Sequence, residues 1–142
     1  MATFTPSIDL GTAWLESIRA QLNAGGAGNP ATIDIYTAKK PSRPDVAITT
    51  QTLLGTVTCS DDCGTVSVID DVPTLTFAAI TADSAANATG VAAWGRAKDG
   101  DTGAAVFDFD ITTTGGVGFG QMNTTNVVVG GPISAPSVIV TA

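Results

Sequence analysis

Aspartates are the side chains in this sequence that come closest to an active-site pattern. They occur in close pairs, of which Asp99/Asp101 and Asp108/Asp110 lie in one stretch. Carboxylate pairs carry out acid–base chemistry in glycosidases, where a cleft lined by aromatic side chains holds them a fixed distance apart. Aromatic residues make up only 6% of this chain, and several of them are needed for a core. We therefore predict that the protein is not an enzyme and has no catalytic residues.

Histidine is absent and cysteine is scarce, which excludes further chemistry. Without histidine, Ser-His-Asp and Cys-His nucleophile systems and histidine-based zinc or iron sites cannot form. Cys59 and Cys63 make a C-x₃-C pair, which needs two more soft ligands to close a structural zinc site. The spacing leaves open whether the two cysteines are thiols or form a loop-closing disulfide. We predict neither a bound metal nor a cofactor.

The segment DGDTG at 99–103 begins like a calcium-binding loop, and Asp110 falls at the twelfth position of that pattern. Apolar-rich runs on both sides instead favour a β-hairpin that has DGDTG as its turn and carries Asp110 away from it. We predict the register in which Lys98 lies opposite Ala104 and Gly95 lies opposite Phe107. Small and large apolar side chains then share a core face, and the outer face carries Trp94, Arg96, Asp108 and Asp110.

Composition and periodicity indicate the elements that must position these side chains. Hydrophobic residues are 44% of the chain and charged residues 13%. Threonine and valine are common while the helix formers Glu, Lys and Gln are scarce, a bias typical of β structure. After residue 28, short alternating runs follow one another between turns. We predict a mainly all-β protein, a β-sandwich or jelly-roll-like barrel with one short N-terminal α-helix.

Residues 9–26 carry the helical pattern, which Asp9 or Thr12 can cap and which Gly25-Gly26 can end. We therefore divide the chain into an N-terminal arm with an amphipathic helix, residues 1–28, and a β-sandwich domain, residues 29–142.

The predicted helix has one apolar stripe, because Trp14, Ile18 and Leu22 stand at i, i+4 and i+8. This stripe must be buried on the protein's own sheet or on a neighbour. Since it lies near a terminus beside the flexible connector AGGAGNP, we predict that it packs on a neighbouring subunit or another partner. The predicted partner-binding residues are Trp14, Ile18, Leu22, Trp94 and Arg96.

The net charge of −7 argues against a nucleic-acid partner, since binding to phosphates depends on lysine and arginine, of which there are six. Lys39, Lys40 and Arg43 cluster in a proline-containing segment, which we interpret as a solvated loop or as a docking site for an acidic partner. No apolar run reaches the length of a membrane helix, and residues 1–11 do not resemble a signal peptide. We therefore expect no membrane association and synthesis in the cytoplasm.

Several segments share their order and pattern with a known group of proteins. A short amphipathic helix ending in GG is followed by IDIYTAKKPSRPD, TLLGTVTCSD, ITADSAANATGVAAWGRAKDGDTGAAVFDFDI and VVVGGPISAPSVIVT. In these segments the chain resembles a family of small virion proteins encoded among the structural genes of tailed bacteriophages and prophages. The most telling match is A-x-A-T-G-x-A-x-W-x-R before the DGDTG turn. The Cys59/Cys63 pair and Gly95, where we expect a bulkier residue, depart from the family pattern.

The resemblance implies a non-enzymatic virion component, and within that class we expect a capsid decoration (cement) protein on the head shell. Its partners would be the major capsid protein or other virion proteins, and it would form a homo-oligomer on a particle assembled in the host cytoplasm. Two alternatives stay open. One is a tail-tip or fibre-associated module, and the other is a carbohydrate-binding module that uses Tyr36 and Trp94 as exposed aromatics.

Overall fold

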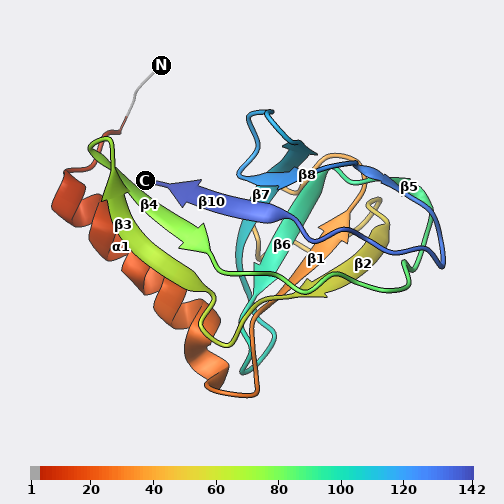
Figure 1. Cartoon of the computed structure of the whole chain (residues 1–142), viewed down its shortest axis with the longest axis horizontal. Helices are drawn as coiled ribbons and strands as arrows, with labels where there is room; N and C mark the ends of the chain where they lie inside the picture. The colour runs from red at the N-terminus through yellow and green to blue at the C-terminus, as the bar shows by residue number, and fades with distance from the viewer. Residues whose placement is uncertain (1–3) are drawn as a thin grey trace.

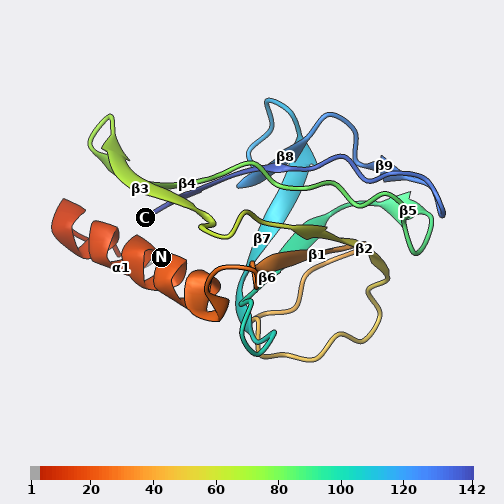
Figure 2. The same ribbon diagram turned by 60° about the horizontal axis from the view of Figure 1, so that its bottom comes forward.

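A computed structural model describes residues 4–142 as one curled eight-stranded sheet, a half-barrel, with one helix packed on one end of it (Figures 1 and 2). Strands hold 37% of the residues and helix 13%. The prediction of a mainly β fold with one N-terminal helix is therefore confirmed.

The strand order in the large sheet is β2-β1-β6-β7-β8-β10-β4-β3, and a small second sheet pairs β5 with β9. All neighbours in the large sheet are antiparallel except β7 and β8. The strands are β1 (Thr32–Tyr36), β2 (Leu53–Thr58), β3 (Gly64–Ile69), β4 (Val72–Phe77), β5 (Gly90–Val91), β6 (Trp94–Lys98), β7 (Ala105–Thr113), β8 (Gly120–Met122), β9 (Asn126–Val127) and β10 (Ser137–Thr141).

The helix α1 (Ile8–Leu22) begins one residue earlier than the sequence pattern indicates. Its N-cap is Ser7, whose side chain accepts a hydrogen bond from the backbone N–H of Leu10. The proposed caps at Asp9 and Thr12 are wrong, because both residues lie inside the helix. At the other end, a short 3₁₀ turn η1 (Asn23–Gly25) leads to Gly26 at φ +68°, so the predicted glycine stop is confirmed.

Helix α1 packs along the hairpin of β3 and β4 (Figures 1 and 2). Its buried residues are Gly11, Leu15 and Leu22, and both leucines belong to the same hydrophobic core as the strands. Gly11 allows this close approach, because a Cβ atom there would lie 2.9 Å from Cγ of Pro73 in β4. The predicted arm therefore contributes directly to the core of the β domain.

The hairpin of β6 and β7 has its predicted faces but not its predicted register. Gly95 lies opposite Phe109, two positions from the predicted Phe107, and a β-bulge follows Ala97. From Trp94 to Ala97 the shift is two residues, which keeps each of these side chains on its original face because side chains alternate with a period of two. Glycine at position 95 has a physical reason, since a Cβ atom there would lie 2.8 Å from the Phe109 ring.

The predicted outer face of this hairpin is largely covered rather than exposed. The segment between β1 and β2, residues 37–52, lies over it. The Trp94 indole N–H donates to the Thr37 carbonyl at 3.1 Å, and its ring stacks on Tyr36 at 4.6 Å between centroids. Arg96 donates twice to Asp108, at 2.8 and 3.0 Å, and reaches the carbonyl of Val46. Trp94, Arg96 and Asp108 are therefore covered, whereas Asp110 at the margin of this face stays exposed.

We expect Arg96→Ala to destabilise the fold by about 3 kcal/mol, because it leaves the Asp108 carboxylate buried without its partner. The side chains of this pair are only 9% and 5% exposed. Urea unfolding followed by circular dichroism measures the effect.

The matched control is Arg43→Ala, which removes an ion pair with Asp45 whose side chains are both 72% exposed. It should change the unfolding free energy by less than about 0.5 kcal/mol. Equal effects of the two substitutions would show that the Arg96–Asp108 pair is solvated.

Candidate protein-interaction surface

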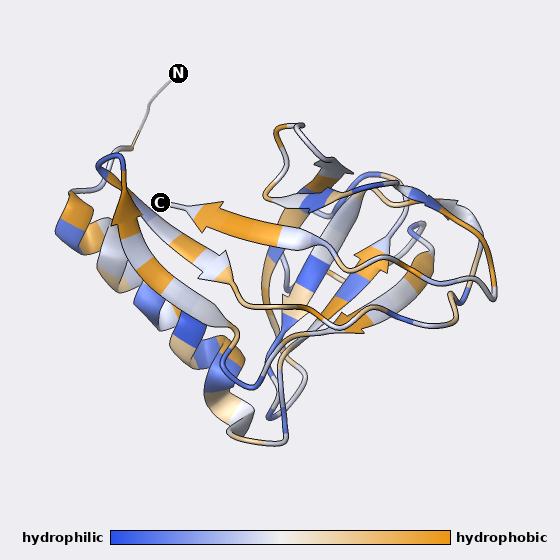
Figure 3. Ribbon diagram, viewed as in Figure 1, coloured by the Kyte–Doolittle hydropathy of each residue, from blue (hydrophilic) through white to orange (hydrophobic). Residues whose placement is uncertain are grey.

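Four apolar side chains near the start of α1, those of Phe4, Ile8, Leu10 and Trp14, remain exposed in the folded chain. Phe4, Leu10 and Trp14 are 69%, 41% and 44% exposed. The rings of Phe4 and Trp14 stack with centroids 5.4 Å apart, and Leu10 lies one turn before Trp14 on the same side of the helix. We call Phe4, Leu10 and Trp14 the Phe4–Trp14 surface. In Figure 3 the first turn of α1, at one end of the molecule, carries hydrophobic residues drawn in orange next to a hydrophilic one in blue.

The predicted apolar stripe is divided between the core and this surface. Leu22 is fully buried and Ile18 packs against the core, so the prediction that they bind a neighbour is wrong for both. The helix turns them onto the protein's own β3–β4 hairpin, together with Leu15. Trp14 precedes Leu15 by one residue, which places it about 100° around the helix and at the margin of the buried face.

Sequence reasoning missed Phe4 and Leu10 as members of an apolar surface. The i, i+4 spacing of Leu10 and Trp14 was the available signal, but it competed with the stronger stripe of core residues. Phe4 lies before the helix, and only the tertiary structure places its ring against Trp14.

The other two predicted partner-binding residues are not accessible. Trp94 is 1% exposed and Arg96 is 7% exposed, so the prediction that they form an outer binding face is wrong. The cause is the covering segment between β1 and β2. Tyr36, the second aromatic proposed for carbohydrate binding, is 8% exposed and stacks on Trp94. These two rings therefore form no exposed aromatic row.

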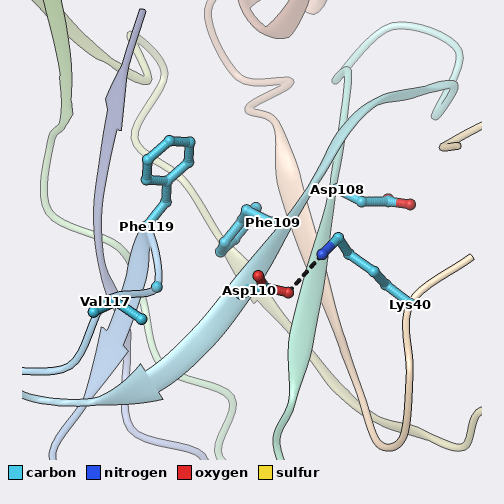
Figure 4. Close-up of a pocket in the computed structure, with 7 residues that line it drawn as sticks. Lys40, Asp108, Phe109, Asp110, Val117 and Phe119 are labelled. Carbon is cyan, nitrogen blue, oxygen red and sulfur yellow. Dashed lines mark hydrogen bonds and ion pairs between the residues drawn. The ribbon is translucent and has the colours of Figure 1, made fainter. Parts of the chain in front are cut away.

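The positive cluster in the segment between β1 and β2 is partly used inside the chain. Lys40 bonds Asp110 at 2.7 Å, and Arg43 pairs with Asp45. The Lys40–Asp110 pair lines a pocket of about 230 Å³ (Figure 4). This pocket is smaller than most small-molecule sites, which start at roughly 300 Å³. Its lining residues are Lys40, Asp108, Phe109, Asp110, Val117, Gly118 and Phe119.

The DGDTG turn uses its first carboxylate for its own backbone. Asp99 accepts hydrogen bonds from the backbone N–H groups of Asp101, Thr102 and Gly103. These bonds, that of Thr102 first, lower the pKa of Asp99 below its ordinary value. Over residues 4–142, no three or more acidic or cysteine side chains gather as a metal site would require. The arrangement is that of a structural turn.

Cys59 and Cys63 are buried thiols in the structure. Burial raises the pKa of Cys59 to about 12, with the neighbouring Cys63 adding to the effect. Burial and then the charge of Asp62 raise the pKa of Cys63 to about 11. The backbone N–H of Cys63 donates to the side chain of Asn23 at 2.9 Å, which ties this loop to the end of α1. Such thiols suit a structural position.

None of the helical segments in the described part of the chain has the length and apolar character that a membrane crossing requires. Comparisons with protein-family models, with curated proteins and with solved structures found no match.

We expect the native protein to react with a thiol reagent at pH 8 at least about a hundredfold more slowly than the urea-unfolded protein. The raised pKa values lower the thiolate fraction relative to an unfolded cysteine, whose pKa is about 8.5. Because folding favours the neutral thiols, their contribution to stability is present below this unfolded pKa and decreases as the pH rises above it.

Absorbance at 412 nm in Ellman's assay, without reductant, measures this rate for native and unfolded protein. Rapid reaction of the native protein would show that the loop opens readily. A lack of reactive thiols after unfolding would show that the pair is oxidised.

Proposed function

We propose that this chain is a non-enzymatic structural protein of a tailed-bacteriophage particle, and that it decorates the head shell by binding the major capsid protein. The observation that carries the proposal is the exposed aromatic pair of Phe4 and Trp14 on a rigid β scaffold. The resemblance of the segments from the helix to the C-terminal strand to phage virion proteins supplies the class of partner.

Aromatic side chains that stand exposed at the margin of a core are well suited to anchor an interface. Tryptophan is enriched among the residues that contribute most to binding, and a contiguous apolar patch on a folded domain commonly marks an interaction site. The backbone at Trp14 is held in place because its neighbour Leu15 is 1% exposed and fixed in the core, and the Trp14 ring stacks on Phe4. The partner surface therefore meets an anchor that has little freedom left to lose on binding.

The charge of the chain favours a partner surface that is neutral or basic. Every cationic side chain except Lys39 pairs with a carboxylate of the same chain. The remaining acidic side chains give the net charge of −7. An acidic partner would therefore be repelled, whereas a shell surface with lysine or arginine around an apolar pocket would be complementary.

We expect Trp14→Ala to lower the melting temperature by no more than about 3 °C, because the side chain is 44% exposed. The same change should weaken binding to particles assembled without this protein by about 30-fold, as the loss of an interface anchor does. Co-sedimentation of purified protein with such particles measures the affinity, and differential scanning calorimetry measures the stability.

Two control variants separate binding from folding. Val117→Ala removes an apolar side chain that is 98% exposed on the loop between β7 and β8, and it should change neither quantity. Leu15→Ala should lower the melting temperature by about 10 °C or more, because it opens a cavity in the core.

Electron microscopy of particles carrying labelled protein distinguishes the two virion roles. Density on the head supports the decoration role. Density confined to the tail would instead support a tail-associated role and contradict decoration. Failure of the wild-type protein to bind either part would overturn the proposal. Unchanged binding by Trp14→Ala would exclude the Phe4–Trp14 surface as the contact.

A further inference from the structure

Strand β3 is one edge of the large sheet, and no strand of residues 4–142 pairs with its outer side. The opposite edge, β2, is largely covered, because Leu54 accepts a hydrogen bond from the backbone of Asn87 and Thr58 bridges to Thr81. At β3, the guanidinium of Arg19 binds the carbonyl of Gly64 at 2.7 Å. Beyond Gly64, the edge of β3 continues without a neighbouring strand within residues 4–142.

The alternation of backbone groups shows which positions of β3 face outward. In β4, the Pro73 carbonyl accepts from Ala142 on the β10 side, so even-numbered residues of β4 point toward β3. On β3, the Cys63 carbonyl accepts from Ala78, so odd-numbered residues of β3 point toward β4. The N–H and C=O groups of the even-numbered residues, including Val66 and Val68, therefore point out of the sheet.

The outward backbone groups of Val66 and Val68 make no hydrogen bond in the described part of the chain. Natural edge strands are usually protected by charged side chains, prolines or bulges. The sequence of β3, GTVSVI, has no charge and no proline, and its pairing with β4 has no bulge. Val68 and Ile69 are also 48% and 51% exposed. Within its own six residues, β3 therefore lacks the usual devices that prevent pairing.

We propose that β3 pairs antiparallel with β3 of a second copy of this chain, about a two-fold axis through Ser67. In this register Val66 lies opposite Val68 of the second copy, and each such pair exchanges two backbone hydrogen bonds. The four bonds use all the outward N–H and C=O groups of the two valines in both copies. A register centred on Val66 would instead need Gly64, whose carbonyl already binds Arg19.

The side chains of the joined strands also match in this register. Val66 and Val68 lie on the same face of β3, so each valine pair buries apolar surface next to the core that Val66 already contacts. On the other face, Ser67 meets its own copy, and Thr65 lies beside Ile69 of the second copy. An isologous pairing of this kind closes as a dimer and leaves no further β3 edge exposed.

Charges at both ends of the paired strands oppose association. In this register Asp70 and Asp71 of one copy lie near Asp62 and Glu16 of the other copy. Arg19 already forms ion pairs with that Asp62 and Glu16. Carboxylates outnumber the single cation there. We therefore expect pairing to strengthen between ~0.05 and ~0.5 M NaCl, as the Debye length falls from above 10 Å to below it.

Site-specific cross-linking tests the register directly. In a non-hydrogen-bonded antiparallel pair the Cα atoms are about 4.5 Å apart, within the range that a disulfide spans. Ser67→Cys should therefore form a disulfide-linked dimer under mild oxidation. Thr65→Cys is the matched control: its two copies stand four positions out of register, roughly 13 Å apart along the strand, and should not cross-link.

Sedimentation velocity tests the association without a new cysteine. We expect a reversible dimer of the wild-type protein at roughly 0.1–1 mM, where weak pairing is populated. Val68→Pro should shift the equilibrium at least tenfold toward monomer, because it removes an outward N–H that the monomer does not use. Val68→Thr keeps this N–H and a similar shape and should still dimerise.

Circular dichroism checks that each variant is folded. If Val68→Pro does not fold, the cross-linking of Ser67→Cys still tests the proposed pairing. A wild-type protein that stays monomeric at ~1 mM in ~0.5 M NaCl would overturn the proposal. So would equal cross-linking at positions 65 and 67. This self-association concerns the isolated protein, so its failure is distinguishable from failure to bind a phage head.

Discussion

The burial of the α1 stripe on the β3–β4 hairpin is the contact on which the arrangement of this protein depends. Leu15 and Leu22 are fully enclosed there, and Gly11 lets the helix approach Pro73 closely. Polar contacts fix the same geometry at the end of the helix, where Arg19 binds Asp62 and Asn23 binds the backbone of Cys63. Because the helix is locked at this angle, its remaining side chains have defined positions on the surface.

The two proposed surfaces lie on opposite flanks of this buried stripe. Arg19 marks the flank at the β3 edge, because it binds Gly64. Trp14 stands five positions earlier, which rotates it by about 140° around the helix to the other flank. A dimer formed through β3 would therefore leave both Phe4–Trp14 surfaces available. The two proposals are compatible in one assembly and are tested independently.

A buried polar layer lies between the β6–β7 hairpin and residues 37–52. Several of the few charged side chains of this chain form ion pairs in it. Arg96 and Lys98 face Asp108 and Asp34 across neighbouring strands. Among residues 4–142 no buried side-chain nitrogen or oxygen lacks a hydrogen-bond partner. This layer positions the segment between β1 and β2 over Trp94. Its role is to complete the fold, so Trp94 and Arg96 are not accessible to a partner.

The amino-acid sequence alone determined the local features of this protein. Alternating threonine and valine runs predicted the strands, the 3.6-residue period predicted α1, and Gly25-Gly26 predicted its end. The two faces of the β6–β7 hairpin were also predictable, since they follow from a period of two. Its register was not, because a bulge after Ala97 lengthens the turn and no side-chain pattern marks it.

Only the tertiary structure decided which segment covers the apolar stripe of α1 and which segment covers the outer face of the β6–β7 hairpin. An amphipathic period shows that a stripe is buried but carries no information about its partner, so Ile18 and Leu22 were assigned to a neighbour although they pack on their own hairpin. Trp94 and Arg96 were assigned to solvent because the segment that covers them has no periodic pattern. The unpaired edge at β3 depends on the order of strands in the sheet. That order is set by long-range pairing, which local sequence does not encode.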